Sequence, residues 1–418
     1  MGIELRPYQQ DIITRGVTVL QNHKFIYLAM EVRTGKTITS LKMLTYLWAK
    51  LVNSDEKKVL FITKKKAISS IERDYDLSHS NFDIMITNYE SLHKVPTKGW
   101  DGVILDEAHS MGKYPKPSKR AKQVKELLYK SKPYVILLSG TPTPESYSQM
   151  YHQVYGIERN PFIQYKNFYA FSKRYVNVTQ KKFGGMVVND YSNGSELILH
   201  HMKPFTISYT QKLAGFETDI EEEIMYVNLQ EKTTQLIKRL KKNLVIEGKG
   251  EVILGDTAVK LMMKIHQLCS GTVKFESGNS MVLDYNKAHI IYNKFKDVKI
   301  AMFYKFKKEL EAIQHIYKEQ VTTELDEFNN TDKSIALQIV SGREGISLKN
   351  AKFLIYYNID FSATSYWQSR DRMTTKDRKY NKIYWIFSKN GIEDKIYKAV
   401  IKKKDYTLNH FRRDLLDL

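Results

Sequence analysis

Short apolar runs alternate with longer segments of mixed polarity through residues 1–145 of the chain. Several runs are followed by a polar turn and then by a segment with a helical period, as in residues 38–51. This alternation is typical of a parallel sheet whose faces are covered by helices. The runs that we expect to form strands are Phe25–Ala29, Val59–Thr63, Ile84–Thr87, Val103–Leu105 and Tyr134–Leu138.

The alternation is lost in residues 146–225, which are rich in Tyr, Asn, Gln and Lys. Gly184-Gly185 and Asn193-Gly194 mark turns there, so we expect an irregular insertion. Residues 229–269 then have a helical period, interrupted near 248–255, and this predicts a helical connector.

Short apolar runs return in the last third of the chain. Strands are expected at Ile300–Tyr304, Ile335–Val340, Phe353–Tyr357 and Ile383–Phe387. The sequence therefore predicts an α/β fold with two parallel-sheet domains in tandem, one over residues 1–225 and the other over 226–418.

Charge narrows the choice of partner. The 418 residues include 66 Lys and Arg against 46 Asp and Glu, a net charge of +20. An excess of this size favours a polyanionic partner such as nucleic acid; an anionic membrane surface or a simple gain in solubility are the alternatives.

The cysteine content and the hydropathy of the chain indicate in which cellular compartment the protein is expected. The single cysteine, Cys269, has no second thiol for an intramolecular disulfide, and we expect it to be a buried packing residue in a reducing compartment. No apolar run approaches the ~20 residues that span a bilayer. The sequence thus predicts a cytoplasmic protein without a membrane partner, and its Lys, Tyr and Asn content favours a bacterium or a phage-infected host.

A phosphate-binding loop is predicted at Ala29–Thr37, where Gly-Lys-Thr follows an apolar run and opens a helical segment. In that context backbone N–H groups face an anion, Lys36 reaches the β- and γ-phosphates, and the Thr37 hydroxyl binds magnesium. The first glycine of the usual motif is replaced by Met30.

Within Gly102–His109, an apolar run is followed by two adjacent carboxylates, Asp106 and Glu107. Ligands of parallel sheets bind at the carboxyl ends of the strands. There Asp106 would hold magnesium and Glu107 would orient or deprotonate the attacking water. The alternative is an acidic helix start that is stabilised by the helix dipole.

A third strand end carries Ser139-Gly-Thr-Pro-Thr-Pro144. Ser139, Gly140 and Thr141 would detect the γ-phosphate and couple it to motion, unless the segment is an ordinary turn.

Two basic segments are candidates for contact with phosphates of a nucleic acid. The first is Lys64-Lys65-Lys66, directly after the run that ends at Thr63. The second is the loop after the carboxylate pair, with Lys113, Lys116, Lys119 and Arg120. A solvated charge run and an exposed loop are the alternatives. Neither segment has a pattern that reads bases, so binding would be independent of sequence.

Taken in order, these segments resemble the motifs of helicase superfamily two, and within it the Swi/Snf-type DNA translocases. Leu5–Gln9 is similar to the Q motif, Ala29–Thr37 to motif I and Ile86–Glu90 to motif Ib. Asp106–His109 is the DEAH form of motif II, and Ser139–Pro142 resembles motif III. In the second half, matches to motifs IV, V and VI begin at Ala301, Ser341 and Gln368.

The resemblance implies two RecA-like domains that bind ATP and Mg2+ between them and move along double-stranded DNA. It implies that Gln9 reads adenine, that Gly345 and Gln368 contact the nucleotide, and that Arg372 stabilises the γ-phosphate. The loop residues that it places around the phosphates are Arg33, Thr34, Gly35, Lys36 and Thr37.

The sequence departs from the family at two positions. Arg33 stands where these translocases usually have glycine, and Thr375 stands where motif VI has its second arginine. Arg378, three residues further on, is a candidate replacement.

Three functions fit these features. The first is an ATP-driven translocase on duplex DNA, and the second is a strand-separating helicase at forks or junctions in replication or recombination. The third is an ATP-dependent DNA-binding switch that does not travel, which the altered motif VI keeps open.

Overall fold

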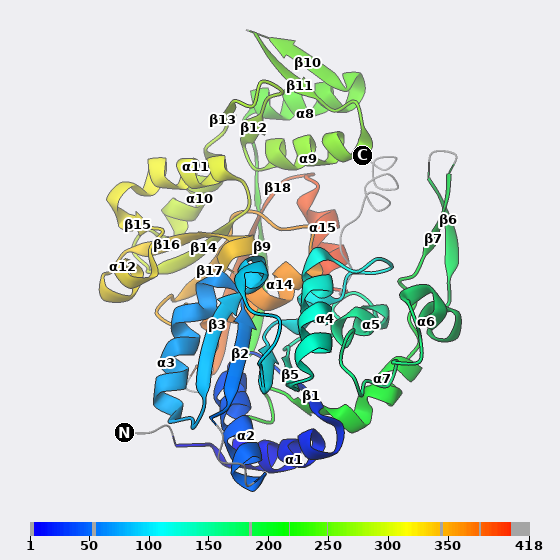
Figure 1. The fold of residues 1–418 in the computed structure, drawn as a ribbon. Coiled ribbons are helices and arrows are strands. Elements are labelled where there is room, and N and C mark those ends of the chain that lie inside the picture. Colours follow the sequence, from blue (N-terminus) through cyan, green and yellow to red (C-terminus); the bar gives the residue numbers. More distant parts are fainter. Residues whose placement is uncertain are drawn as a thin grey trace. The chain divides into compact units, whose positions relative to one another are not determined.

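The computed structural model describes residues 4–51, 56–183, 186–216, 218–248, 250–342, 346–375 and 378–402. The chain forms two compact units, Met1–Gly215 (unit 1) and Phe216–Leu418 (unit 2), coloured blue to green and green to red in Figure 1.

Unit 1 is built on a six-stranded parallel sheet with the order β3-β2-β4-β5-β1-β8. All five strands predicted from the sequence are present, with ends shifted by at most one residue. The strands are β1 (Phe25–Met30), β2 (Lys58–Thr63), β3 (Asp83–Asn88), β4 (Gly102–Leu105), β5 (Tyr134–Leu138) and β8 (Thr206–Tyr209).

Helices cover both faces of this sheet, which is why its strands are nearly continuous apolar runs. Alternate strand residues enter two different cores: Phe25 and Tyr27 belong to one, Ile26 and Leu28 to the other. The helices are α1 (Pro7–His23), α2 (Lys36–Lys50), α3 (Ile68–Ser78), α4 (Lys119–Ser131), α5 (Met150–Gln153), α6 (Phe168–Tyr175) and α7 (Leu197–Met202).

The predicted irregular insertion contains regular structure. Helices α5 and α6 precede an antiparallel pair, β6 (Thr179–Phe183) and β7 (Met186–Asp190), which projects from the unit, and α7 follows it (Figure 1). Strand β8 follows and extends the sheet beside β1. These elements are too short to impose a clear period on the sequence. An aromatic core that includes Phe162, Phe168 and Phe171 stabilises this region. The predicted turn at residues 184–185 lies outside the described residues.

Unit 2 is built on a second six-stranded parallel sheet, with the order β15-β16-β14-β17-β18-β9. The four predicted strands are present. One of them ends at Gln338 instead of Val340, because residues 339–342 form a helical turn, α13 (Ile339–Gly342). The strands are β9 (Asp219–Val227), β14 (Ile300–Tyr304), β15 (Val321–Thr322), β16 (Ser334–Gln338), β17 (Phe353–Tyr356) and β18 (Tyr380–Ser388).

The predicted helical connector is part of unit 2. Leu240 of α8 and Ile265 of α9 pack in the same core as Phe303 of β14, and Cys269 is buried there as expected. The helices of this unit are α8 (Glu231–Asn243), α9 (Ala258–Cys269), α10 (Asn286–Phe295), α11 (Lys307–Tyr317), α12 (Leu325–Asn330), α14 (Ala363–Arg370) and α15 (Glu393–Val400). Two hairpins flank α9: β10 (Val245–Gly248) with β11 (Glu251–Leu254), and β12 (Thr272–Lys274) with β13 (Ser280–Val282).

The two units divide between Gly215 and Phe216, whereas the sequence placed the boundary after residue 225. The reason is β9, which pairs along its whole length with β18 and so joins the second sheet. Within the described ranges, no helix is both long and apolar enough to cross a membrane.

Candidate active site

The predicted phosphate-binding segment Ala29–Thr37 includes the end of β1 and the start of α2, and residues 31–35 form the loop between these two elements. Gly35 (φ 81°) and Arg33 (φ 64°) both lie in the left-handed region. Arg33 therefore keeps the backbone conformation that glycine adopts without steric cost, although an L side chain disfavours it by about 1 kcal/mol or more. Arg33 thus replaces the glycine of the family, but the backbone turn at this position keeps the conformation typical of glycine.

Lys36 begins α2, where the helix dipole and the exposed N–H groups favour an anion. Its Nζ donates a hydrogen bond to the Glu31 carbonyl oxygen at 3.3 Å. The Thr34 hydroxyl donates to the same oxygen at 2.7 Å. Two side chains of this segment thus donate to the same carbonyl oxygen of Glu31. Lys36 is the residue predicted to reach the phosphates.

Asp106 follows β4 at the carboxyl edge of the same sheet. The Thr63 hydroxyl, at the end of β2, donates to Asp106 Oδ2 at 2.7 Å. Burial and the neighbouring Glu107 carboxylate raise the pKa of Asp106 to about 6, against the opposing effects of Thr63 and Lys36. The structure therefore brings the two predicted carboxylates and the predicted lysine into one electrostatic group.

Glu107 adopts a left-handed backbone conformation with φ 49°. Its Oε2 lies 3.2 Å from His109 Nδ1, and the same nitrogen lies 2.9 Å from Ser139 Oγ. Ser139 Oγ also accepts a hydrogen bond from the Thr141 backbone N–H at 3.1 Å. Motif II and the third strand end are connected here through one imidazole.

Gly140 lies against the phosphate-binding loop. A Cβ atom at this position would be 3.4 Å from both the Met30 carbonyl oxygen and the Val32 nitrogen. These separations are ordinary van der Waals distances, so residue 140 lies in direct contact with the loop. Gly140 thus lies beside the loop, and the coupling role of Ser139, Gly140 and Thr141 stays a prediction.

Gln9 is buried, and its polar atoms bind unit 1 itself. Its Nε2 donates to Thr39 Oγ1 at 3.2 Å and to the Gly35 carbonyl at 3.4 Å, and its Oε1 accepts from the Arg6 backbone N–H at 3.0 Å. In this structure Gln9 fixes the start of α2 against α1. Its role as adenine reader stays a prediction.

In unit 2, Gln368 and Arg372 are neighbours, as their spacing predicts, although α14 ends at Arg370 and Arg372 lies in the following 3-10 turn. The Arg372 side chain is buried; its Nε donates to the Gln368 carbonyl at 3.0 Å and its Nη1 to the Ile346 carbonyl at 3.4 Å. Gly345 lies outside the described residues.

Arg378 lies just before β18, at the amino-terminal edge of the second sheet. Its guanidinium donates to the backbone carbonyls of the segment that precedes β17, at 3.2 Å to Lys349, 2.7 Å to Ala351 and 2.7 Å to Lys352. These bonds assign the side chain a structural task. Its action as a replacement for the motif VI arginine stays a prediction.

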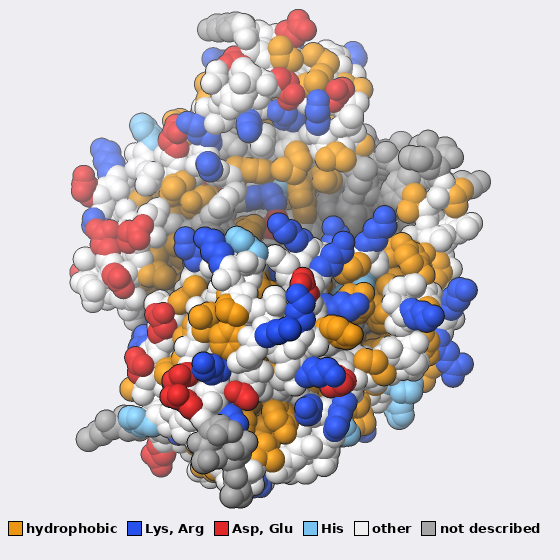
Figure 2. Space-filling view, in the orientation of Figure 1, with side chains coloured by type: hydrophobic (Ala, Val, Ile, Leu, Met, Phe, Trp, Pro, Cys, Tyr) orange, Lys and Arg blue, Asp and Glu red, His pale blue; other side chains and the backbone are white. Residues whose placement is uncertain are grey.

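The predicted DNA-binding residues follow strand ends of unit 1. Lys65 and Lys66 are exposed and Lys64 is half-buried, directly after the carboxyl end of β2. Lys and Arg side chains gather over α4 and the neighbouring loops in Figure 2. The exposed side chains of the second basic segment are Lys113, Lys116 and Lys119.

Arg120 differs from the lysines around it. Its guanidinium pairs with Glu90 at 2.5 Å and lies 4.7 Å from the centre of the Tyr89 ring. The Tyr89 hydroxyl in turn donates to the Asp106 carbonyl at 2.7 Å. Arg120 therefore supports the motif II turn, and contact with DNA stays a prediction for this residue.

Sequence reasoning missed Thr63 and Tyr89, which bind the side chain and the backbone of Asp106. Thr63 could have been found, because it is the last residue of a predicted strand beside the one that ends in Asp106. Tyr89 gives no such signal, since only folding brings it to Asp106.

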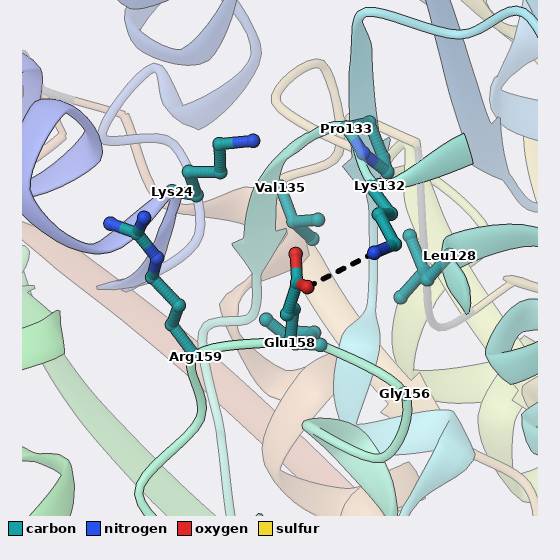
Figure 3. Close-up of a pocket in the computed structure, with 9 residues that line it drawn as sticks. Lys24, Leu128, Lys132, Pro133, Val135, Gly156, Glu158 and Arg159 are labelled. Carbon is teal, nitrogen blue, oxygen red and sulfur yellow. Dashed lines mark hydrogen bonds and ion pairs between the residues drawn. The ribbon is translucent and has the colours of Figure 1, made fainter. Parts of the chain in front are cut away.

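A pocket at the other edge of the unit 1 sheet contains none of the predicted site residues (Figure 3). Lys24 and Pro133, which precede β1 and β5, line it, and an ion pair of 3.2 Å joins Lys132 to Glu158 across it. Its volume is about 10 Å³, which is no more than the space of one water molecule.

Asp106→Asn is expected to stabilise the nucleotide-free protein at neutral pH. Because the pKa of Asp106 is raised from 3.8 to about 6, the folded state binds this proton more tightly than the unfolded state does. The stability that the proton contributes is present below pH 4 and is lost as the pH rises through 6, by about 3 kcal/mol.

Thermal unfolding in magnesium-free buffer at pH 5 and pH 7.5 would measure this effect. We expect the advantage of Asp106→Asn over the wild type to grow with pH. The exposed substitution Asp297→Asn is the matched control. An advantage that is the same at both pH values would contradict the assigned pKa.

Three protein families match the chain in succession. Residues 2–75 match the res subunit of type III restriction enzymes, 69–273 the SNF2-related domain and 273–374 the helicase conserved C-terminal domain. Two tandem parallel-sheet units, with the Gly-Lys-Thr loop and the Asp-Glu-Ala-His strand end in unit 1, define the class as helicase superfamily two. Within that class, the domains that match residues 69–273 and 273–374 are those of the Swi/Snf-type helicases.

Curated relatives include the nuclear protein STH1/NPS1 of Saccharomyces cerevisiae, 22% identical over 97% of this chain and 34% of the relative. Another is the chromodomain-helicase-DNA-binding protein 1-like of Mus musculus, 20% identical over 97% of this chain and 50% of the relative. The chain thus spans half or less of the length of these two relatives. A solved SWI2/SNF2 ATPase core of Sulfolobus solfataricus in complex with dsDNA is 18% identical, covers 96% of this chain and 92% of that one, and has a TM-score of 0.44.

Proposed function

We propose that this chain is a DNA-dependent ATPase that uses ATP hydrolysis to move along double-stranded DNA without reading its sequence. One observation carries the proposal: a lysine at the start of a helix and a half-buried pair of carboxylates share the carboxyl edge of the unit 1 sheet. Exposed lysines follow the end of β2 at the same edge.

The residues at this edge fit ATP and Mg2+. Loss of hydration at Asp106 and the neighbouring Glu107 carboxylate raise the pKa of Asp106, and a divalent cation would relieve the cost of holding these two charges together. Nowhere in the described ranges do three or more His, Cys, Asp or Glu side chains form a metal-binding group. Magnesium would therefore be held by Asp106, Thr37 and the phosphate oxygens of the nucleotide, as is usual for this ion.

Each residue has a separate task in this mechanism. Bound magnesium would neutralise charge on the phosphates during transfer. Lys36 and the N–H groups at the start of α2 would stabilise the negative charge of the γ-phosphate. Glu107 would orient the attacking water and accept its proton, while His109 and Ser139 would transmit the change at Glu107 to the third strand end.

ATP turnover tests this proposal directly. It should be measured in parallel with no nucleic acid, single-stranded DNA, duplex DNA and RNA, and we expect the highest rate with duplex DNA. Displacement of a triplex-forming strand would show movement, and a fork assay would show whether strands separate. Equal turnover under all four conditions would contradict a DNA-dependent enzyme.

A second function, an ATP-dependent DNA-binding switch, is favoured by one observation in unit 2. Arg372 and Arg378 both donate to backbone carbonyls of their own unit. If neither guanidinium leaves these carbonyls, hydrolysis would be slow and binding of ATP alone would change the affinity for DNA. A switch would bind duplex DNA in an ATP-dependent manner without displacing a triplex strand.

Affinity for duplex DNA is expected to fall steeply with salt and to differ little between unrelated sequences. Each phosphate that a lysine neutralises contributes about 0.9 to the slope of log affinity against log salt. Replacing Lys64, Lys65 and Lys66 together with glutamine should lower that slope by about 2 to 3 units.

The matched control removes the same charge from exposed positions of α8. It replaces Lys232, Lys238 and Lys242 with glutamine. An equal loss of slope in both variants would show that the net charge acts as a whole, and an unchanged slope in the first would remove these three lysines from the DNA-binding surface.

A further inference from the structure

The phosphate-binding loop is fastened to the last segment of unit 1. The Glu31 backbone N–H donates to the Tyr209 carbonyl at 3.0 Å, which continues the pairing of β1 with β8. In return, the Gln211 backbone N–H donates to Glu31 Oε2 at 2.7 Å, and Gln211 Nε2 donates to the Val32 carbonyl at 3.0 Å. Three hydrogen bonds therefore connect residues 31–32 with residues 209–211.

Stacked tyrosines connect the same two segments a second time. The rings of Tyr8 and Tyr209 are parallel, with centres 4.5 Å apart, and the Tyr8 hydroxyl donates to the Thr34 carbonyl at 3.0 Å. The Tyr209 hydroxyl donates to the Leu213 carbonyl at 3.0 Å. Tyr209 thus contacts the surroundings of the loop on one side and, on the other, the chain that leads into unit 2 at Phe216.

Glu31 takes part both in the hydrogen bonds between residues 31–32 and 209–211, which we call the brace, and in the predicted phosphate site. Its carboxylate accepts from Gln211, while its carbonyl accepts from Lys36 Nζ at 3.3 Å. An anion in the loop would compete with that carbonyl for Lys36 and would order the loop through its N–H groups. A shift of Glu31 would then alter its hydrogen bonds with residues 209–211.

We propose that Glu31 and Gln211 are positioning residues that couple nucleotide binding in the loop to the order of residues 206–212. The inference rests on the proposed function, because it requires the loop to bind a nucleotide. Coupling between two sites is reciprocal, so the brace that the nucleotide strengthens must also strengthen nucleotide binding. Met30 stands where the usual motif has glycine, and in this chain the loop that follows it is held by hydrogen bonds to residues 209–211.

Hydrogen exchange of the full chain, with and without the magnesium complex of the analogue AMP-PNP, measures the coupling without turnover. In the wild type we expect the analogue to slow exchange at residues 31–37 and at residues 206–212. Affinity for a fluorescent ATP analogue, measured by titration, gives the reciprocal quantity.

Glu31→Ala removes the charged acceptor of the Gln211 N–H. Hydrogen bonds to charged groups are worth enough for about a 10-fold effect or more. We expect exchange at 206–212 to rise about 10-fold without nucleotide, its protection by AMP-PNP to be lost, and affinity for the ATP analogue to fall by a similar factor. Glu31→Gln keeps an oxygen acceptor and should restore most of both.

Gln211→Ala removes only the bond to the Val32 carbonyl, so its effects should be about 3-fold. Gln235→Ala is the matched control, because Gln235 also donates its amide within its own unit, to Glu231 on α8. We expect it to leave exchange at 206–212 and nucleotide affinity unchanged.

Two results would overturn the inference, and they are distinguishable. Protection at 31–37 without any at 206–212 in the wild type, or equal protection at 206–212 in Glu31→Ala, would reject the coupling and leave the nucleotide site intact. Absence of protection at 31–37 in the wild type would reject both the coupling and the proposed function.

Discussion

Lys36→Ala should reduce ATP turnover by a factor of about 10² to 10³, because it removes a preorganised cation from the charge that develops on the transferring phosphoryl group. The ammonium lies at the start of α2, with Asp106 within its electrostatic reach. Lys50→Ala, in the last turn of the same helix, is the matched control and should retain wild-type turnover.

Glu107→Gln should be as inactive as Lys36→Ala, but for a different reason. The amide can still hydrogen-bond, yet it cannot accept the proton of the attacking water, and general-base catalysis contributes about 10² to 10⁴. The variant should still bind a fluorescent ATP analogue with near wild-type affinity. Substantial turnover by either variant would contradict the assigned site.

Arg372→Ala is expected to lose about three orders of magnitude of DNA-stimulated turnover, the effect typical of an arginine that stabilises phosphoryl transfer in trans or from a second domain. Arg372 is buried and its donors engage the carbonyls of Gln368 and Ile346. Circular dichroism and thermal unfolding must therefore accompany the rates. Arg372→Lys keeps the charge without the planar fork and should recover only part of the activity.

Arg378→Ala provides the comparison. Its guanidinium holds the backbone of residues 349–352, so we expect its loss to lower the unfolding temperature of unit 2 and, through that, the turnover. Wild-type turnover of Arg372→Ala would show that this motif VI does not act as it does in the family. Orders of magnitude lost by Arg378→Ala at unchanged stability would transfer the role to Arg378.

The sheets could be predicted from the sequence because their strands are buried on both faces. A strand such as Val59–Thr63 must then be a short continuous apolar run, which stands out between amphipathic helices. Strand β8 (Thr206–Tyr209) has no such run, since it lies at the sheet edge, and β9 carries three consecutive glutamates, Glu221, Glu222 and Glu223. Both strands were missed, and the unit boundary was misplaced with them.

The candidate site residues could be identified from the motifs, because phosphate binding depends on a short local pattern. Residues 29–37 place a lysine and a hydroxyl at a helix start whatever the rest of the chain does. The carboxyl edge of a parallel sheet then brings Asp106 to the same place, since strands that run in one direction end at one edge.

Only the tertiary structure decided what surrounds those residues. Thr63, Tyr89 and Gln211 are distant in sequence from the groups that they bind, and a single polar residue leaves no periodic signal. The same holds for Arg378, because only the folded unit brings its guanidinium to the carbonyls of Ala351 and Lys352. The sequence alone therefore determined most strands of the two sheets, the predicted phosphate loop and the carboxylate pair, which depend on local patterns. The partners of each side chain depended on contacts that exist only after the sheets have formed.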